Sequence, residues 1–195
     1  SEDSFIAAQL VLRARRFAAP PQDHAGVVLG CDFARGLRDF NWFIDRRGRQ
    51  AGRLVNERFH SQDTEDIAGR LSRLIERTKP AMCFLDAGGG GAAVYDILSA
   101  RGFARRMTLI NFGAAPRDKR RWANRRAEMW GELRDWLADP GGAAIPDDDV
   151  LESELTAPGY KYNANQQVVL EDKDSIRARL GASTDGGDAL ALTFA

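Results

Sequence analysis

The fold is constrained most by a change in the spacing of apolar residues along the chain. Three runs, at 27–33, 40–45 and 51–59, are apolar or alternating as β-strands are, and short connections join them. After the third run, apolar residues recur at helical spacing over 63–79, and strand-like and helical segments then alternate. The pattern predicts three antiparallel strands followed by a helix–strand–helix–strand unit.

The segments that follow extend this α/β pattern. They are a strand at 81–85, a helix between Gly91 and Gly102, a strand at 107–112, an amphipathic helix at 122–137, a loop and β-ribbon at 143–172, and helices at 174–180 and 185–194. Because a crossover connection is right-handed, we expect the later strands to lie parallel to the first, in one mixed sheet flanked by helices, with the additional β-ribbon near the C-terminus. Two prolines stop a helix predicted at 4–18, so residues 1–21 are interpreted as a leading helix or linker and residues 22–195 as one domain.

Charge and reactive side chains exclude several classes of protein. Lys plus Arg and Asp plus Glu both number 28, which excludes a polycationic nucleic-acid coat but not a local basic face. Cys31 and Cys83 lie in apolar runs and cannot by themselves build a disulfide framework or a zinc site. Neither His24 nor His60 lies near a plausible nucleophile, and the chain has no GxxxxGK[ST] phosphate-binding loop.

The chain has no segment typical of a membrane or secreted protein. No apolar stretch approaches the roughly 20 residues of a membrane span. The N-terminus lacks the charged start, apolar middle and cleavage site of a secretory signal. We therefore expect a soluble, cytoplasmic protein without a membrane partner.

Carboxylates at the ends of buried strands are the candidate functional groups. Asp32 interrupts the most apolar strand, where a carboxylate is costly unless a cation or hydrogen-bond donors compensate it. Asp86 ends the next buried strand and precedes a run of glycines. If the two strands are parallel neighbours, both carboxylates emerge at the carboxyl edge of the sheet, the usual place for sites in open α/β sheets.

Two further acids, Asp185 and Asp188, lie three residues apart at the start of the last helix and hence on one face. Oxygen ligands without histidine or thiolate suit magnesium or manganese. Two such ions, about 3.5–4 Å apart, would stabilise the attacking and leaving oxygens of a phosphodiester and activate a water molecule. Asp32, on a central strand, is the candidate bridging ligand. Each acid also has an ordinary interpretation as a turn residue or helix cap.

Three runs resemble the nuclease domain of the large terminase subunit of tailed bacteriophages. They are GCDFA at 30–34, FLDAGGG at 84–90 and RLGASTDGGDALALTF at 179–194. The last run is the most specific, although the family's common Ser-Pro-Asp is Ser183-Thr184-Asp185 here. The resemblance covers the chain from about residue 25 to its end and implies a ribonuclease H-like fold, related to that of Holliday-junction resolvases.

The resemblance also implies an activity. Such domains are metal-dependent endonucleases that cut concatemeric viral DNA when packaging begins and when the head is full. The family's catalytic acids map onto Asp32, Asp86 and an acid of the last helix, for which we favour Asp188, with Asp185 as a neighbouring metal ligand. Two Mg²⁺ or Mn²⁺ ions are the implied cofactors.

Double-stranded DNA is the implied substrate, and the terminase ATPase domain, small terminase subunit and portal protein are the implied partners. The ATPase motor that normally precedes the nuclease is not in the sequence. We therefore expect an excised C-terminal domain or a prophage fragment, in the cytoplasm of a bacterial host. The alternatives are a junction resolvase or transposase-like nuclease of the same fold, and an inactive module that docks on the portal or the motor.

Basic side chains are candidate DNA contacts, because arginine pairs with phosphates and releases counterions. The candidates are Arg35, Arg38, Arg117, Lys119, Arg120, Arg121, Arg125 and Lys173. The alternative for the clusters is a solvated face paired with acids. Lys173, in an acidic turn, is either a contact to the scissile phosphate or a solvated side chain.

Overall fold

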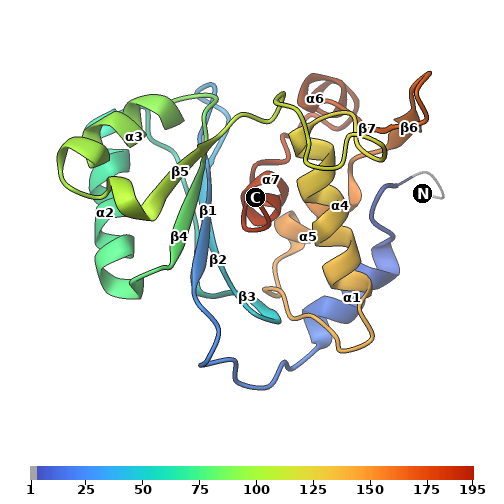
Figure 1. Ribbon diagram of the computed structural model, residues 1–195, viewed down its shortest axis with the longest axis horizontal. Coiled ribbons are helices and arrows are strands. Elements are labelled where there is room, and N and C mark those ends of the chain that lie inside the picture. Colours follow the sequence, from blue (N-terminus) through green and yellow to red (C-terminus); the bar gives the residue numbers. More distant parts are fainter. Residues whose placement is uncertain (1–3) are drawn as a thin grey trace.

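The protein is a five-stranded mixed sheet with helices on both faces and a separate two-stranded hairpin (Figure 1). The computed structural model describes residues 4–195. Its strands are β1 (Val28–Asp32), β2 (Asn41–Arg47), β3 (Gln50–Phe59), β4 (Met82–Asp86), β5 (Met107–Ile110), β6 (Tyr160–Tyr162) and β7 (Val168–Leu170). Its helices are α1 (Ala8–Arg16), α2 (Thr64–Thr78), α3 (Gly91–Ala100), the 3₁₀ turn η1 (Ala104–Arg106), α4 (Arg125–Ala138), α5 (Asp149–Thr156), α6 (Lys173–Leu180) and α7 (Asp185–Leu192).

The sheet has the order β3-β2-β1-β4-β5. β1 pairs antiparallel with β2, and β2 with β3, whereas β1 pairs parallel with β4, and β4 with β5. The predicted fold class, with three antiparallel strands, then parallel strands and a β-ribbon near the C-terminus, is therefore confirmed. This order places β1 at the centre of the sheet.

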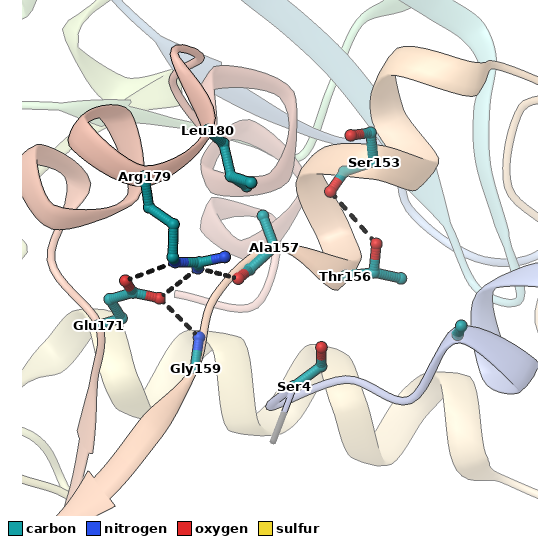
Figure 2. A pocket seen from close by; sticks show the side chains of 9 residues that line it. Ser4, Ser153, Thr156, Ala157, Gly159, Glu171, Arg179 and Leu180 are labelled. Carbon is teal, nitrogen blue, oxygen red and sulfur yellow. Dashed lines mark hydrogen bonds and ion pairs between the residues drawn. The ribbon is translucent and has the colours of Figure 1, made fainter. Parts of the chain in front are cut away.

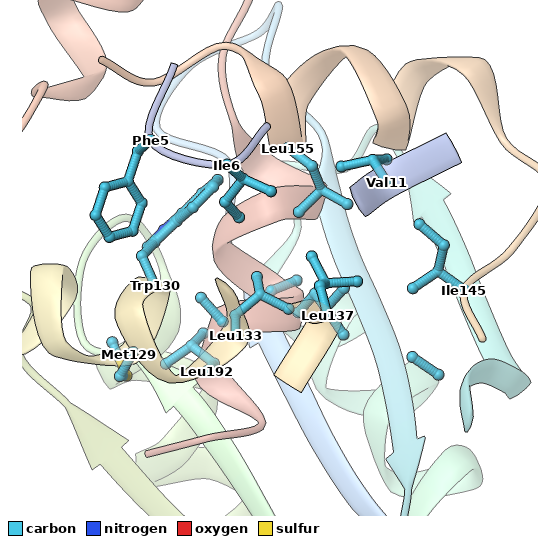
Figure 3. Close-up of a cluster of buried hydrophobic side chains, with 14 of the residues drawn as sticks. Phe5, Ile6, Val11, Met129, Trp130, Leu133, Leu137, Ile145, Leu155 and Leu192 are labelled. Carbon is cyan, nitrogen blue, oxygen red and sulfur yellow. The ribbon is translucent and has the colours of Figure 1, made fainter. Parts of the chain in front are cut away.

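Two apolar clusters lie on opposite faces of the sheet. Along β2, Trp42 and Ile44 belong to one cluster and Phe43 to the other, as the alternation of side chains along a strand requires. α2 and α3 contribute to the Phe43 cluster. α1, α4, α5 and α7 contribute to the Trp42 cluster, part of which is drawn in Figure 3. The central strand is therefore covered on both faces.

The ends of α2 follow the signals in the sequence. The side chain of Asp63 accepts hydrogen bonds from the backbone amides of Glu65 and Asp66, which lack partners within the helix. Lys79 ends the helix in the left-handed conformation, with φ of 46°, directly before Pro80. The helix predicted at 63–79 is thus observed as α2, with Asp63 as its N-cap.

The segment 143–172 differs from expectation, because it contains a helix as well as a ribbon. Asp148 caps α5 by accepting from the amides of Val150 and Leu151, and Pro158 follows the helix. α5 has eight residues, too few for its apolar spacing to stand out from a loop. The β-ribbon predicted within the same segment is observed as β6 and β7.

The helix expected at 122–137 begins later than predicted. Asn124 accepts a hydrogen bond from Ala127 and so starts α4 at Arg125. Trp122 therefore lies before the helix, where it forms a bridge to Val168 of the hairpin. Its apolar side chain fits the helical spacing, although its backbone is not helical.

The first described residues are part of the packed structure. Phe5, Ile6, Val11 and Ala14 are buried in the same cluster as residues of α4 and α5. The division of the chain into a leading segment at 1–21 and a domain at 22–195 stays a prediction. Within the described residues, no helix is long and apolar enough to span a bilayer.

α7 lies directly against the central strand, and this contact requires a glycine in β1. A Cβ atom built on Gly30 would lie 1.8 Å from the carbonyl oxygen of Ala189 in α7. Such a distance is impossible for two unbonded atoms, so the helix can approach this closely only where the strand has no side chain.

We predict that Gly30→Ala lowers the free energy of unfolding by about 3 kcal/mol, because the added methyl group must push α7 off the sheet. The matched control is Gly69→Ala in α2, where the nearest atom to an added Cβ is the end of the Arg73 side chain at 3.4 Å. That change should stabilise the protein by about 1 kcal/mol through helix propensity. Urea unfolding of both variants tests the prediction, and equal stabilities would contradict it.

Candidate active site at the carboxyl edge of the sheet

Asp32 and Asp86 lie beside each other at one edge of the sheet. They are the last residues of β1 and β4, which run parallel with Cys31 opposite Leu85. Their exposed fractions are 0% and 2%. The structure thus brings together the two strand-end acids as their positions in the sequence indicated.

The first turn of α7 brings Asp185 and Asp188 to the same place. α7 packs against β1 and β2, and both acids are buried. Asp185 accepts hydrogen bonds from the Ser183 hydroxyl and, at 3.0 Å, from the backbone amide of Phe40. Four carboxylates from β1, β4 and α7 therefore share one region of the interior.

The ammonium group of Lys173 lies among these carboxylates. Its Nζ is 3.1 Å from Asp32, 3.0 Å from Asp188 and 3.9 Å from Asp185. The lysine is the first residue of α6, and only 10% of its side chain is exposed. It is therefore not the solvated side chain that one interpretation of the sequence predicted. Its contact with the scissile phosphate stays a prediction.

Asp188 is held by donors on both of its carboxylate oxygens. Oδ1 accepts from Arg126 Nε at 2.9 Å and from Trp130 Nε1 at 2.8 Å. Oδ2 accepts from the Thr184 hydroxyl at 2.8 Å and lies next to Lys173. Burial alone would raise its pKa, but Arg126, Lys173 and these hydrogen bonds hold the pKa well below its usual range. Asp188 is therefore ionised and fixed in place.

The other acids are compensated less completely. Burial raises the pKa of Asp32 well above its ordinary value, the neighbouring carboxylates add to the rise, and Lys173 opposes it. Burial also raises the pKa of Asp185. Asp86 accepts from the Gly88 amide through Oδ1, but its buried Oδ2 has no hydrogen-bond partner among the described residues. The nearest cation to that oxygen is Arg35, at 3.9 Å.

The chemistry of these ligands suits a hard divalent cation, although the side chains are not arranged as a finished metal site. Among residues 4–195, no group of three or more His, Cys, Asp or Glu side chains is positioned to hold a metal ion. The cation at the centre of the carboxylates is instead the ammonium of Lys173. The unpartnered oxygen of Asp86 and the raised pKa of Asp32 show that more positive charge would be accommodated here.

Comparison with known proteins gives matches among solved structures only. No protein-family pattern matches the chain, and no curated protein is similar enough to match. The nuclease domain of the large terminase subunit gp2 of bacterial virus Sf6 superposes with a TM-score of 0.81 at 18% identity, covering 98% of each chain. The large terminase nuclease from thermophilic phage G20c with bound magnesium superposes at 0.71 and 18% identity, covering 100% of this chain and 97% of that one.

The fold is that of the phage large terminase nuclease domains. A third example, the large terminase nuclease domain of Thermus phage P74-26, has a TM-score of 0.60 at 19% identity and covers 92% of this chain and 83% of its own. Mutant forms of the Sf6 domain are known with manganese and with calcium, and the G20c domain is known with cobalt. The terminase nuclease fold identified from three sequence motifs is thus found over nearly the whole chain.

The cations proposed to contact DNA differ widely in their surroundings. Arg35 and Arg38 are exposed beside β1. The basic cluster at 117–125 is largely paired: Arg117 with Glu128 and Glu132, Arg120 with Asp118, Arg121 with Asp135, and Arg125 with Glu128. Acids thus compensate much of this cluster, as the alternative interpretation of the sequence proposed, while Lys119 is exposed.

None of the four carboxylates lines the pocket drawn in Figure 2. It is lined by residues near the start of the described chain, by α5 and by α6. Arg179 donates to Glu171 at 2.7 Å and to the carbonyl oxygen of Ala157 at 2.8 Å across it. Because these charges pair with each other, the pocket is not a second candidate for the active site.

Sequence reasoning missed the residues that hold the acids in position. Arg126 follows Arg125 in the same basic run as the exposed arginines, but its side chain is 9% exposed and paired with Asp188. Trp130 fits the apolar spacing of the amphipathic helix predicted at 122–137, but its indole N–H also donates to Asp188. Their separations of 62 and 58 residues from Asp188 leave no local pattern that would reveal the pairing.

We predict that Lys173→Met lowers the free energy of unfolding by about 3–5 kcal/mol at pH 7, because it leaves buried carboxylates without their cation. The acids left behind are stable when protonated in the folded state, so the loss should shrink as the pH falls from 7 towards 5. The control is Lys119→Met, on the exposed surface, which should change stability by less than about 0.5 kcal/mol. Denaturant unfolding at both pH values measures the effect, and a Lys173→Met loss that grows on acidification would contradict it.

Proposed function

We propose that this protein is a metal-dependent DNA endonuclease that cleaves concatemeric viral DNA during genome packaging. The observation that carries the proposal is the convergence of Asp32, Asp185 and Asp188 on the buried ammonium of Lys173. Asp86 lies beside Asp32, at the end of the neighbouring parallel strand. The fold supports the proposal, because the matching solved structures are large terminase nuclease domains. Several of those structures contain Mg²⁺, Mn²⁺, Co²⁺ or Ca²⁺.

Carboxylates at this edge of the sheet would hold the metal ions. A pair of Mg²⁺ or Mn²⁺ ions would activate a water molecule and stabilise the charge on the attacking and leaving oxygens. Asp32, on the central strand, is the proposed bridging ligand, and Asp86 has a free buried oxygen beside it. On α7 we place Asp185 ahead of Asp188 as a ligand, because four donors already occupy the oxygens of Asp188.

Other side chains would position the substrate. The proposed DNA contacts remain the basic residues predicted from the sequence, which are Arg35, Arg38, Arg117, Lys119, Arg120, Arg121, Arg125 and Lys173. The chain carries no net charge, so its affinity for duplex DNA would depend on these local clusters and fall with salt. In this proposal the ATPase domain, the small terminase subunit and the portal protein are partners, and the protein acts in the cytoplasm of a bacterial host, as a phage or prophage product. Residues 22–195 are the proposed nuclease domain.

Two other functions remain distinguishable by experiment. A junction resolvase or transposase-like nuclease of the same fold would prefer a four-way junction over linear duplex, whereas a packaging nuclease would not. An inactive docking module would bind a portal ring or the motor without any metal-dependent cleavage. The buried, compensated carboxylates favour the nuclease, because an inert docking surface needs no charges in the interior.

We predict that Mn²⁺ or Mg²⁺ supports nicking and linearisation of plasmid DNA, and that Asp32→Asn lowers the rate about 100-fold or more by removing the bridging ligand. Gel analysis of supercoiled plasmid over time measures the rate. The control is Asp45→Asn, at another buried carboxylate, on β2, which should leave the rate within about 3-fold. Undiminished cleavage by pure, folded Asp32→Asn protein would refute the assignment.

Arg120 and Arg125, which differ in exposure within the basic cluster at 117–125, test the DNA contact. Arg120 is 95% exposed, whereas the Arg125 side chain is 13% exposed and lies 2.5 Å from Glu128. We predict that Arg120→Ala weakens duplex binding about 3-fold and reduces the salt slope by about one, since it removes one phosphate contact. Arg125→Ala should weaken binding less. Fluorescence anisotropy in metal-free buffer measures both, and salt-independent binding by the unaltered protein would rule out these clusters as the DNA contact.

A further inference from the structure

A buried acid outside the carboxylate cluster holds the beginning of α7. Glu154, on α5, is 7% exposed. Its Oε2 accepts hydrogen bonds from the backbone amides of Gly186, at 2.6 Å, and Gly187, at 3.1 Å. These two glycines lie between Asp185 and Asp188, so the contact is made on the backbone that carries both acids of α7.

The first turn of α7 needs an acceptor from outside the helix. The first amides of a helix have no partner within it, and a side chain at the N-cap commonly supplies one. Here the N-cap residue, Thr184, makes no such bond: its hydroxyl donates to Asp188 and accepts from Arg126 instead. Glu154 takes the place of the missing cap.

Two tryptophan side chains pack closely against this turn. A Cβ atom on Gly186 would lie 2.8 Å from the Trp42 ring, and one on Gly187 would lie 2.7 Å from the Trp130 ring. The two indoles enclose the turn, and Glu154 binds the two amides that they leave inside. Buried amides without an acceptor are costly, so the turn keeps this position only while the acceptor is present.

An acid is an expensive choice for this contact. Burial, together with the charges of Asp185 and Asp188, raises the pKa of Glu154 to about 8, although the two amides oppose the rise. An apolar residue would pack here without that cost. The acceptor oxygen is therefore the property that the position uses.

We propose that Glu154 is a positioning residue for divalent-cation binding, acting through α7. Its side-chain oxygen fixes the first turn of the helix and thereby sets where Asp185 and Asp188 stand relative to Asp32 on β1. The effect on cation binding rests on the proposed metal-dependent function. The contact between Glu154 and the α7 amides does not depend on any metal.

The experiment compares Glu154→Met, which keeps the volume and removes the acceptor, with Glu154→Gln, which keeps an acceptor oxygen. Mn²⁺ alone is the probe, titrated into the full chain and followed by electron paramagnetic resonance of the free ion. We expect Glu154→Met to weaken Mn²⁺ binding about 10-fold and Glu154→Gln to stay within about 3-fold of the unaltered protein. Hydrogen exchange should be at least about 10-fold faster at the Gly186 and Gly187 amides of Glu154→Met than of Glu154→Gln.

Asp45 offers a matched control. Its Oδ1 also accepts from two consecutive backbone amides of β3, those of Leu54 at 2.9 Å and Val55 at 2.8 Å, but it serves the β2–β3 hairpin. Asp45→Leu should lower the unfolding midpoint without changing Mn²⁺ affinity. A loss of affinity that merely follows the loss of stability in both variants would overturn the positioning role.

The outcomes separate the two proposals. If folded Glu154→Met binds Mn²⁺ as the unaltered protein does, or if the Gly186 and Gly187 amides of the unaltered protein exchange as fast as exposed loop amides, Glu154 is not a positioning residue. The second measurement needs no variant and so decides even if Glu154→Met fails to fold. If the unaltered protein binds no Mn²⁺ and cleaves no DNA, the proposed function and the metal consequence fail together, and the exchange data still decide the anchor.

Discussion

Four carboxylates can share the interior of this protein because cations are buried with them. Lys173 lies 3.1 Å from Asp32, and Arg126 lies 2.9 Å from Asp188. A buried carboxylate without a partner costs several kcal/mol and would take up a proton instead. The compensating side chains come from α6 and α4, so charge balance ties α6 to the end of the central strand and α4 to the first turn of α7. Arg126 strengthens the connection by donating to the carbonyl oxygen of Glu171, just before α6, at 2.7 Å.

The acids meet because α7 approaches the sheet more closely than a helix with ordinary neighbours can. Gly30 admits the backbone of α7 at Ala189, while Gly186 and Gly187 admit the rings of Trp42 and Trp130. The same small residues that allow this approach leave backbone amides inside, which then require an acceptor. Close packing of α7 therefore creates the need for a hydrogen-bond acceptor at its first turn. α5 packs against α7 through Leu151 and Leu155 and supplies that acceptor through Glu154.

More of the architecture than of the candidate site could be predicted from the sequence. Hydrophobic periodicity and the right-handed crossover predict one mixed sheet whose later strands run parallel to the first. The strand ends predict that Asp32 and Asp86 meet if their strands are parallel neighbours, which the sheet order then supplies. The burial of Lys173 could not be predicted in this way, because its partner Asp32 lies 141 residues away. The short helix that carries Glu154 has only eight residues and so gives no clear periodic signal. The contact of Glu154 with Gly186 spans 32 residues, and no local pattern indicates it. Local patterns specify elements, whereas the pairing of charges depends on which elements finally face each other.

The four acids differ in how fully their oxygens are occupied by hydrogen-bond partners, and the sequence motif does not reveal this difference. Asp188 has two donors on one oxygen, and a hydroxyl and an ammonium on the other, so an ion could reach it only by displacing a partner. Asp86 has a buried oxygen without a hydrogen-bond partner within residues 4–195, and an ion there would recover free energy that the protein now forgoes. Asp32 shares the Lys173 ammonium with other carboxylates, and burial raises the pKa of Asp32. For the proposed nuclease, Asp86 and Asp32 therefore gain most from a divalent ion, and Asp188 acts chiefly by holding Arg126 and Lys173 beside them.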